Sequence, residues 1–139
     1  MLKLRKNVLV LLFMVLVFSC TKKLDYSPLD KSKSFLVGPT KARTWKLESY
    51  LINSLPQVLS LNQKRYSKTF YFSGQFDDAD GSSGQWQLPV VDSLVEKYQN
   101  FPSGTPAIQG YKILGISDQN LILQYTINGT TYTTIYKAL

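Results

Sequence analysis

The stretch that decides the fold is Asn120-Leu121-Ile122-Leu123-Gln124-Tyr125-Thr126-Ile127, followed by Asn128-Gly129 and by Thr130-Thr131-Tyr132-Thr133-Thr134-Ile135-Tyr136. The odd positions of its first segment are apolar and the even positions mostly polar, which is the two-residue period of a β-strand with one buried face. Asn and Gly tolerate the positive φ angles that a type I′ turn requires. The stretch therefore predicts a β-hairpin with a two-residue turn.

A two-residue turn also fixes which side chains share a face. The inward face receives four cross-strand pairs: Leu121 with Tyr136, Leu123 with Thr134, Tyr125 with Tyr132 and Ile127 with Thr130. A buried hydroxyl without a partner costs about 1–3 kcal/mol, so a cavity holding water or a polar-ended ligand would satisfy this cluster. We therefore take Tyr125, Tyr132, Tyr136 and Thr134 as candidate ligand contacts. The alternative is that the tyrosines reach the rim and leave their hydroxyls in solvent, while Ile122 and Ile135 on the outward face fit a covering element or a partner.

Other segments carry weaker strand patterns. Residues 44–52, 68–76, 85–88 and 111–116 alternate apolar and polar side chains, and Gly115 in the last of them suggests a bulge. Residues 91–98 are ambiguous, because the valines favour a strand whereas Ser93-Leu94-Val95-Glu96 fits a capping box that starts a helix. Trp45 and Trp86 are expected in the core. Residues 42–139 thus form one antiparallel all-β domain.

The first 19 residues have the three parts of a signal peptide. Lys3, Arg5 and Lys6 form a basic start, an apolar run covers residues 8–18, and the small Ser19 stands before Cys20. A transmembrane helix is the alternative, but it needs roughly 20 apolar residues and this run is shorter. We therefore expect export and cleavage.

Residues Val17-Phe18-Ser19-Cys20 resemble the lipobox of bacterial lipoproteins, in which the cysteine receives a diacylglycerol and becomes the new N-terminus. Cys20 is the only cysteine of the chain. The alternative, a soluble secreted protein, would leave an unpaired thiol in an oxidising compartment. The resemblance implies a lipid anchor on Cys20, including palmitate, and a location at the outer membrane. No acidic run follows Cys20, which favours a protein facing the periplasm.

The charge is distributed unevenly along the chain. The formal net charge is +7, yet from residue 42 onward eight basic residues face seven acidic ones. Residues 20–41 hold Lys22, Lys23, Pro28 and Pro39 among few apolar residues, which predicts a flexible tether. Lys22 and Lys23 either touch anionic lipid headgroups or are simply solvated. A near-neutral domain on an exported chain disfavours nucleic-acid binding.

The sequence contains few residues that could act as catalytic or metal-binding groups. The chain has no histidine, which excludes Ser-His-Asp, Cys-His and histidine-bearing metal sites. Asp77, Asp78 and Asp80 could form a carboxylate or Ca²⁺ site, but we interpret residues 77–84 as a solvated hairpin turn. We therefore expect no enzyme, no cofactor and no metal. Asp92-Ser93-Leu94 matches a short O-glycosylation motif of exported Bacteroidetes proteins, so Ser93 is a candidate modification site or a helix cap.

The order of six short segments resembles that of the lipocalin-like lipoproteins of the Bacteroidetes. The segments are Trp45-Lys46-Leu47, Phe70-Tyr71-Phe72, Gly84-Gln85-Trp86, Tyr111-Lys112-Ile113, Leu121-Ile122-Leu123 and the final strand from Tyr132 to Tyr136. The resemblance implies an up-and-down β-barrel that holds one small apolar or amphipathic molecule. The alternative is a structural accessory lipoprotein whose outer face docks an outer-membrane protein.

Overall fold

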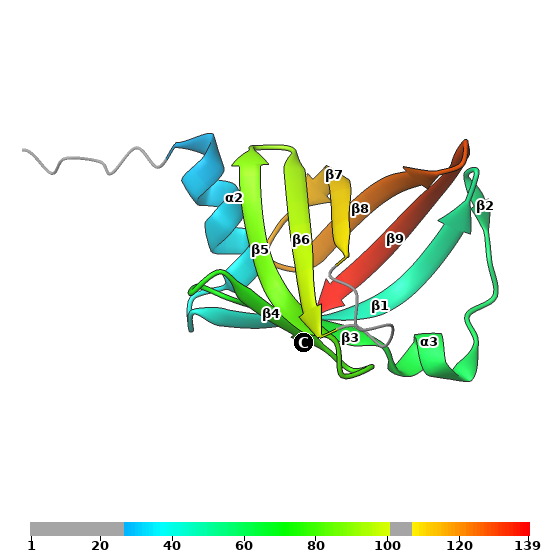
Figure 1. Ribbon diagram of the computed structural model, residues 1–139, viewed down its shortest axis with the longest axis horizontal. Coiled ribbons are helices and arrows are strands. Elements are labelled where there is room, and N and C mark those ends of the chain that lie inside the picture. The colour runs from blue at the N-terminus through cyan, green and yellow to red at the C-terminus, as the bar shows by residue number, and fades with distance from the viewer. Residues whose placement is uncertain (1–26, 101–106) are drawn as a thin grey trace, which may run out of the picture.

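The computed structural model describes residues 27–100 and 107–139, and more than half of them belong to one antiparallel sheet (Figure 1). Its strands are β1 (Ala42–Ile52), β2 (Leu55–Pro56), β3 (Ser67–Tyr71), β4 (Gln75–Asp78), β5 (Ser83–Val90), β6 (Ser93–Asn100), β7 (Ile108–Ile116), β8 (Asn120–Ile127) and β9 (Thr130–Ala138). From β3 to β9 each strand pairs with the next along the chain, while β2 pairs only with β1.

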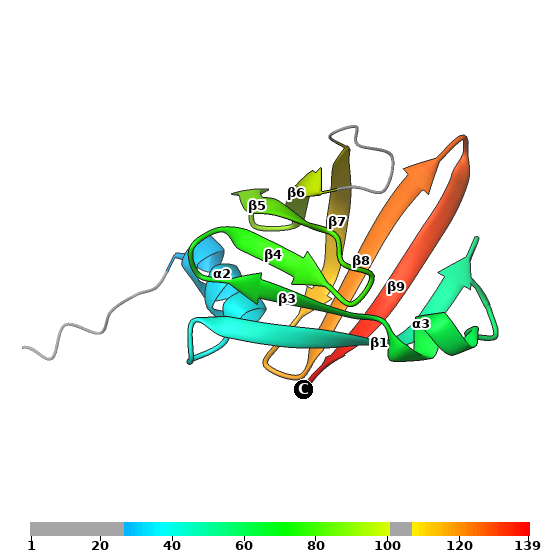
Figure 2. The same ribbon diagram turned by 60° about the horizontal axis from the view of Figure 1, so that its bottom comes forward.

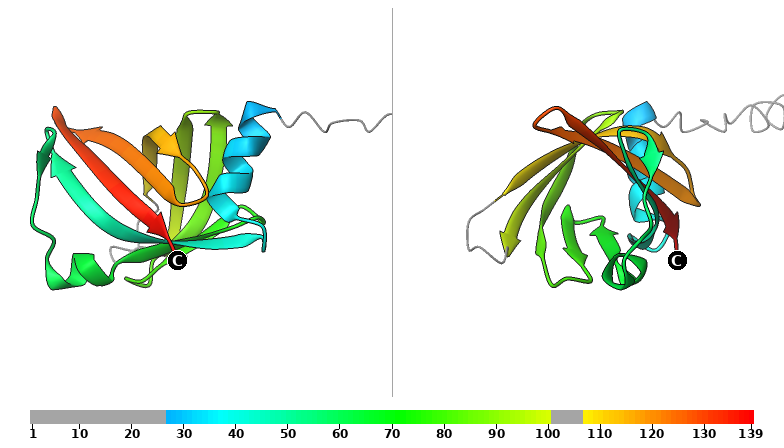
Figure 3. Two further views of the ribbon diagram at one scale, coloured as in Figure 1. Left: turned by 180° about the vertical axis from the view of Figure 1, so that it is seen from behind. Right: turned by 90° about the vertical axis from the view of Figure 1, so that its right-hand side faces the viewer.

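The sheet closes on itself because β1 also pairs with β9, from Trp45 opposite Ala138 to Ile52 opposite Tyr132. Closure removes the unpaired strand edges that would otherwise invite association with other chains. Seen from one end, the strands lie in a ring around a common axis (Figure 3, right). The predicted all-β, antiparallel up-and-down barrel is confirmed.

The two ends of the barrel differ. Helix α2 (Pro28–Val37) lies across the end that carries the turns at residues 72–74, 91–92 and 117–119, here called the α2 end (Figure 2). The opposite end carries the turns at 53–54, 79–82 and 128–129 and is called the hairpin end. The short helix α3 (Leu61–Arg65) belongs to the connection that leads from β1 at the hairpin end to β3.

The predicted hairpin is confirmed in its turn and its register. Asn128 and Gly129 have φ angles of 48° and 79°, as a type I′ turn requires. The four predicted pairs, from Leu121 opposite Tyr136 to Ile127 opposite Thr130, are all present. Burial along this face decreases toward the tip, where Ile127 is exposed.

The expectation of a flexible tether through residue 41 is wrong for residues 28–37. Pro28 opens α2 at a position where proline is favourable, and the Ser27 hydroxyl accepts a hydrogen bond from the backbone N–H of Asp30. Leu36 and Val37 are buried, and the indole of Trp45 donates to the Leu36 carbonyl at 2.9 Å. Burial against the barrel therefore stabilises a helix that composition alone disfavours. The predicted signal peptide, Cys20 and the predicted tether as far as residue 26 lie outside the described residues.

Three further expectations have definite outcomes. Residues 68–76 form two strands joined by a turn, because Phe70 pairs with Phe76 and Phe72 points out to solvent. Residues 93–100 form strand β6, so the capping-box helix is wrong. The predicted bulge in β7 is present between Ile113 and Gly115.

An apolar core fills the part of the barrel next to α2. Trp45, Phe70, Phe76, Leu94 and Leu121 are at most 2% exposed, and Trp86 is buried as predicted.

None of the helices in residues 27–100 and 107–139 has the length and apolar character that crossing a bilayer needs.

Candidate functional site

Four tyrosines form a row of contacting rings inside the barrel, toward the hairpin end. The rings of Tyr125 and Tyr132 stack with centroids 5.1 Å apart, and Tyr50 of β1 stacks on Tyr132 at 6.1 Å. Tyr111 of β7 meets Tyr125 edge to face at 5.5 Å. The structure thus brings the predicted Tyr125 and Tyr132 together and adds Tyr50 and Tyr111. We call these four residues the tyrosine row.

Tyr136 and Thr134, the other two predicted ligand contacts, lie deeper in the barrel. Each is 7% exposed, and the Thr134 hydroxyl donates to the Leu123 carbonyl at 3.4 Å. Burial raises the pKa of Tyr136 and is also the main cause that raises the pKa of Tyr125 to about 12. These phenols are therefore neutral at physiological pH and act as hydrogen-bonding groups, not charges.

A buried ion pair lies beside the tyrosine row. The Lys68 Nζ is 2.6 Å from the Glu96 Oε2, and their side chains are 4% and 0% exposed. The hydroxyls of Tyr98 and Tyr111 donate to the same Oε2 at 2.8 and 3.2 Å. The Lys68 ammonium also lies 5.2–5.8 Å from the ring centroids of Phe76, Tyr98 and Tyr111. A cation within about 6 Å of aromatic faces gains electrostatic stabilisation.

The second carboxylate oxygen, Glu96 Oε1, has no hydrogen-bond partner among the described residues and is out of contact with solvent. Burial and the charge of Glu96 together raise the pKa of Tyr111 and of Tyr98 well above the ordinary value, which keeps both phenols protonated. Desolvating a carboxylate oxygen without a partner costs free energy, so native structures seldom leave one unpaired. Oε1 therefore has the capacity to accept a further hydrogen bond.

Lys68 and Glu96 were not identified from the sequence as site residues. The alternation of inward and outward side chains along their strands nevertheless indicates that both point into the barrel. Lys68 stands two residues before the inward Phe70, and Glu96 lies between the inward Leu94 and the partly buried Tyr98. The two-residue period puts both charged side chains on the inner face. Which strands bring them together is decided by the pairing of β3 to β6 through β4 and β5.

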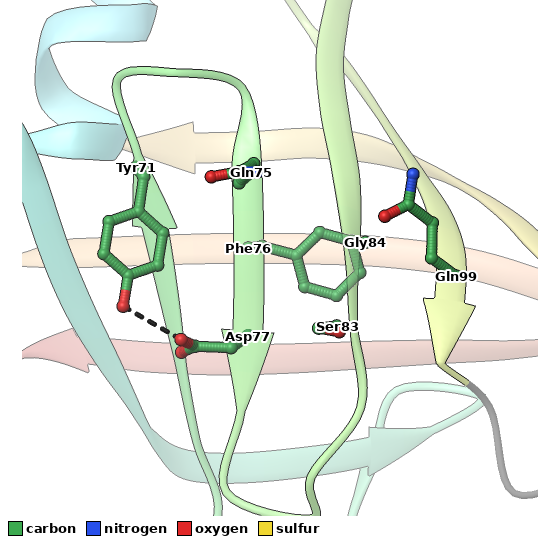
Figure 4. A pocket seen from close by; sticks show the side chains of 7 residues that line it. All are labelled: Tyr71, Gln75, Phe76, Asp77, Ser83, Gly84 and Gln99. Carbon is green, nitrogen blue, oxygen red and sulfur yellow. Dashed lines mark hydrogen bonds between the residues drawn. The ribbon is translucent and has the colours of Figure 1, made fainter.

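The outer face of β3–β6 has a shallow hollow of about 300 Å³ (Figure 4). In it the Tyr71 hydroxyl donates to the Asp77 carboxylate at 2.9 Å, and this hydrogen bond raises the pKa of Tyr71. Phe76 and Gly84 line the hollow from β4 and β5. Because Tyr71 and Asp77 satisfy each other and the hollow is shallow, we assign it no ligand.

The acidic residues of the predicted solvated turn take structural positions. Asp77 and Asp78 lie in β4, and the Asp78 Oδ1 accepts from the backbone N–H groups of Asp80 and Ser82 at 3.0 Å. The turn itself is shorter than expected and covers residues 79–82. Within residues 27–100 and 107–139 no group of three acidic or other ligating side chains is placed to hold a metal ion.

Ser93, the candidate O-glycosylation site, opens strand β6 and is half-buried. It lines an outer hollow of about 480 Å³ together with Asp92, Lys112 and Gln124. Its position in a strand rules out the alternative role as a helix cap, and modification of Ser93 stays a prediction.

No protein-family profile matches this sequence, and no curated protein does. The crystal structure of a lipocalin-like protein from Bacteroides uniformis is similar to this chain, with a TM-score of 0.49 and 20% sequence identity. The match covers 73% of this chain and 96% of that chain. The assignment of a closed antiparallel barrel rests on the strand pairing described above.

Proposed function

We propose that this chain is a lipoprotein, anchored through Cys20 at the outer membrane and facing the periplasm, whose barrel binds a small amphipathic ligand without catalysing a reaction. The observation that carries the binding proposal is Glu96 Oε1, a buried acceptor that lacks a partner in the described chain. A ligand hydroxyl or amine would supply the missing donor.

The composition of the surrounding interior supports an amphipathic rather than a purely apolar ligand. The tyrosine row offers ring faces for an apolar skeleton, and its hydroxyls offer polar contacts along the same path. Ligand sites in proteins are mostly apolar with a few converging polar groups, and this interior has that character. The hydroxyls of Tyr98 and Tyr111 already donate to the other oxygen, Oε2, so a ligand donor would complete the hydrogen bonding of this carboxylate at Oε1.

The ion pair itself favours a binding role. Two buried charges lose hydration that their attraction seldom fully recovers, so a buried pair is weak evidence for stability. A role in ligand recognition therefore explains the burial of Lys68 and Glu96 better than a contribution to stability does.

A second candidate function, docking of an outer-membrane protein partner, is supported by exposed apolar side chains at the hairpin end. These are Leu55, Val58, Leu61, Ile108 and Ile127. The outward Ile122 and Ile135, considered for the same role, pair across β8 and β9 and are half-buried. They therefore offer less free surface than the hairpin end.

The test is a fluorescence titration of the full chain in lipid nanodiscs with N-phenyl-1-naphthylamine, an apolar probe with one N–H donor. We expect saturable binding above an empty-nanodisc blank. Tyr132→Phe keeps the stacked ring but loses the hydroxyl, so it should weaken binding about fivefold, which corresponds to one hydrogen bond of about 1 kcal/mol. Leu123→Ala should mainly lower stability.

Two controls make the result specific. Tyr71→Phe removes a hydroxyl from the outer hollow and should leave probe affinity unchanged. 1-Phenoxynaphthalene, which has nearly the same shape but no N–H, should bind more weakly than the amine. Absence of saturable binding to the wild-type chain would end the ligand proposal and leave docking as the better candidate.

A further inference from the structure

Four large apolar side chains are exposed around the α2 end. Leu29 lies on α2, Phe72 lies in the turn between β3 and β4, and Val90 and Val91 lie where β5 turns into β6. They are between 37% and 54% exposed. We call these four residues the α2-end patch. Figures 1 and 2 show that their three segments lie at the same end of the barrel.

Contacts through α2 hold the three segments together. The Lys33 Nζ lies 4.3 Å from the centroid of the Phe72 ring, and the Ser32 hydroxyl donates to the Val91 carbonyl at 3.4 Å. A hollow of about 340 Å³ runs between the helix and the strands, with Leu29, Lys33 and Phe72 among its lining residues. The patch is thus a fixed surface feature.

Basic residues accompany the patch. Residues 27–41 contain Lys31, Lys33 and Lys41 against the single acidic Asp30, whose carboxylate accepts from the Ser27 hydroxyl at 2.7 Å. Asp92, in the turn between β5 and β6, and Asp118, in the turn at residues 117–119, are acidic residues at the same end of the barrel. Exposed apolar groups flanked by lysines are the pattern of a surface that lies in the headgroup region of a bilayer.

The sequence places the lipid anchor near this end. Only six residues separate Cys20 from Ser27, the N-cap of α2, and seven fully extended steps reach about 25 Å at most. Strand β9 alone has nine residues, or about 30 Å, so the hairpin end lies much farther from the attachment point. The exposed apolar side chains at the hairpin end are correspondingly harder to bring to the same membrane.

We infer that the α2-end patch rests on the surface of the bilayer, and that the hairpin end, with the tyrosine row, is turned away from the membrane. This inference depends on the proposed anchoring through Cys20. In this orientation the helix closes the membrane-facing end of the barrel, and a ligand or partner approaches from the aqueous side.

The test compares two labelled positions in the full, lipidated chain. Val90→Cys lies in the patch and Thr126→Cys lies near the tip of the hairpin, and both residues are exposed. Once Cys20 is lipidated, each introduced thiol is the only one available for a bimane label. The proteins are reconstituted into vesicles of phosphatidylethanolamine and phosphatidylglycerol at 3:1 that contain a doxyl-labelled quenching lipid.

We expect the label at position 90 to be quenched at least twofold more strongly than the label at position 126. Equal quenching, or stronger quenching at position 126, would overturn the orientation even though the protein remains on the vesicles. Cys20→Ala serves as the separate test of the anchor. A wild-type chain that fails to float with vesicles, or that takes up no palmitate analogue, would overturn the anchoring proposal and with it this inference.

Discussion

Breaking the ion pair between Lys68 and Glu96 should destabilise the barrel far more than breaking an ion pair on its surface. Lys68→Met keeps an unbranched side chain that is one atom shorter, but removes the ammonium that lies 2.6 Å from Glu96. The carboxylate would then stay in a site that is 0% exposed, with only hydroxyl donors. Removing one partner of a buried pair typically costs about 3–5 kcal/mol.

The size of this effect relative to the whole domain makes it easy to measure. A domain of this length has a total stability of about 5–15 kcal/mol, so the variant should lose a large share of it. The melting temperature should fall by at least about 12 °C, since each kcal/mol shifts Tm by about 4–8 °C in a domain of this size. Urea denaturation followed by the fluorescence of the buried Trp45 and Trp86 measures the change directly.

The chain contains a matched control. Lys137 and Glu48 form an ion pair at 3.5 Å with side chains 60% and 50% exposed, and exposed pairs contribute about 0–1 kcal/mol. Lys137→Met should therefore have a small effect. The double variant Lys68→Met with Glu96→Gln removes both charges. Its loss of unfolding free energy should therefore be smaller, by about 2 kcal/mol, than the sum of the losses of the two single variants. A Lys68→Met variant that loses no more stability than Lys137→Met would refute the reasoning.

Two further predictions concern the hairpin turn and the buried phenols. Gly129→Val should lower the free energy of unfolding by more than about 1 kcal/mol, because a β-branched residue is strained at a φ of 79°. Gly110→Val is the control, because a side chain there also meets open space but φ is not positive. Equal urea midpoints for the two variants would show that the turn does not require glycine. Burial raises the pKa of Tyr98, Tyr111 and Tyr136, whereas the phenols of the unfolded chain ionise near pH 10. Below that pH these tyrosines should not affect the free energy of unfolding. Above it, each of them should lower the free energy of unfolding by about 1.4 kcal/mol per pH unit. Tyr136→Phe should make this fall shallower in urea titrations between pH 9 and 11, and a constant wild-type stability over that range would contradict the burial of these hydroxyls.

The sequence alone determined the local features of this protein. The two-residue period and Asn128-Gly129 specify the last hairpin with its register, because the turn geometry depends only on residues next to each other in the chain. The same alternation identified Tyr125 and Tyr132 as inward neighbours. The prediction of one strand over residues 68–76 was wrong because the alternation of Phe70, Phe72 and Phe76 continues through a turn without a break in pattern.

Only the tertiary structure decided the features that join distant segments. Closure between β1 and β9 depends on the curvature and twist of the whole sheet, which no local pattern records. Helix α2 is stable because Leu36 and Val37 find a surface to cover, and that surface exists only after the barrel has formed. Lys68 and Glu96 are 28 residues apart and meet because three successive strand pairings bring β3 and β6 around the same interior, where low solvent access makes their attraction strong.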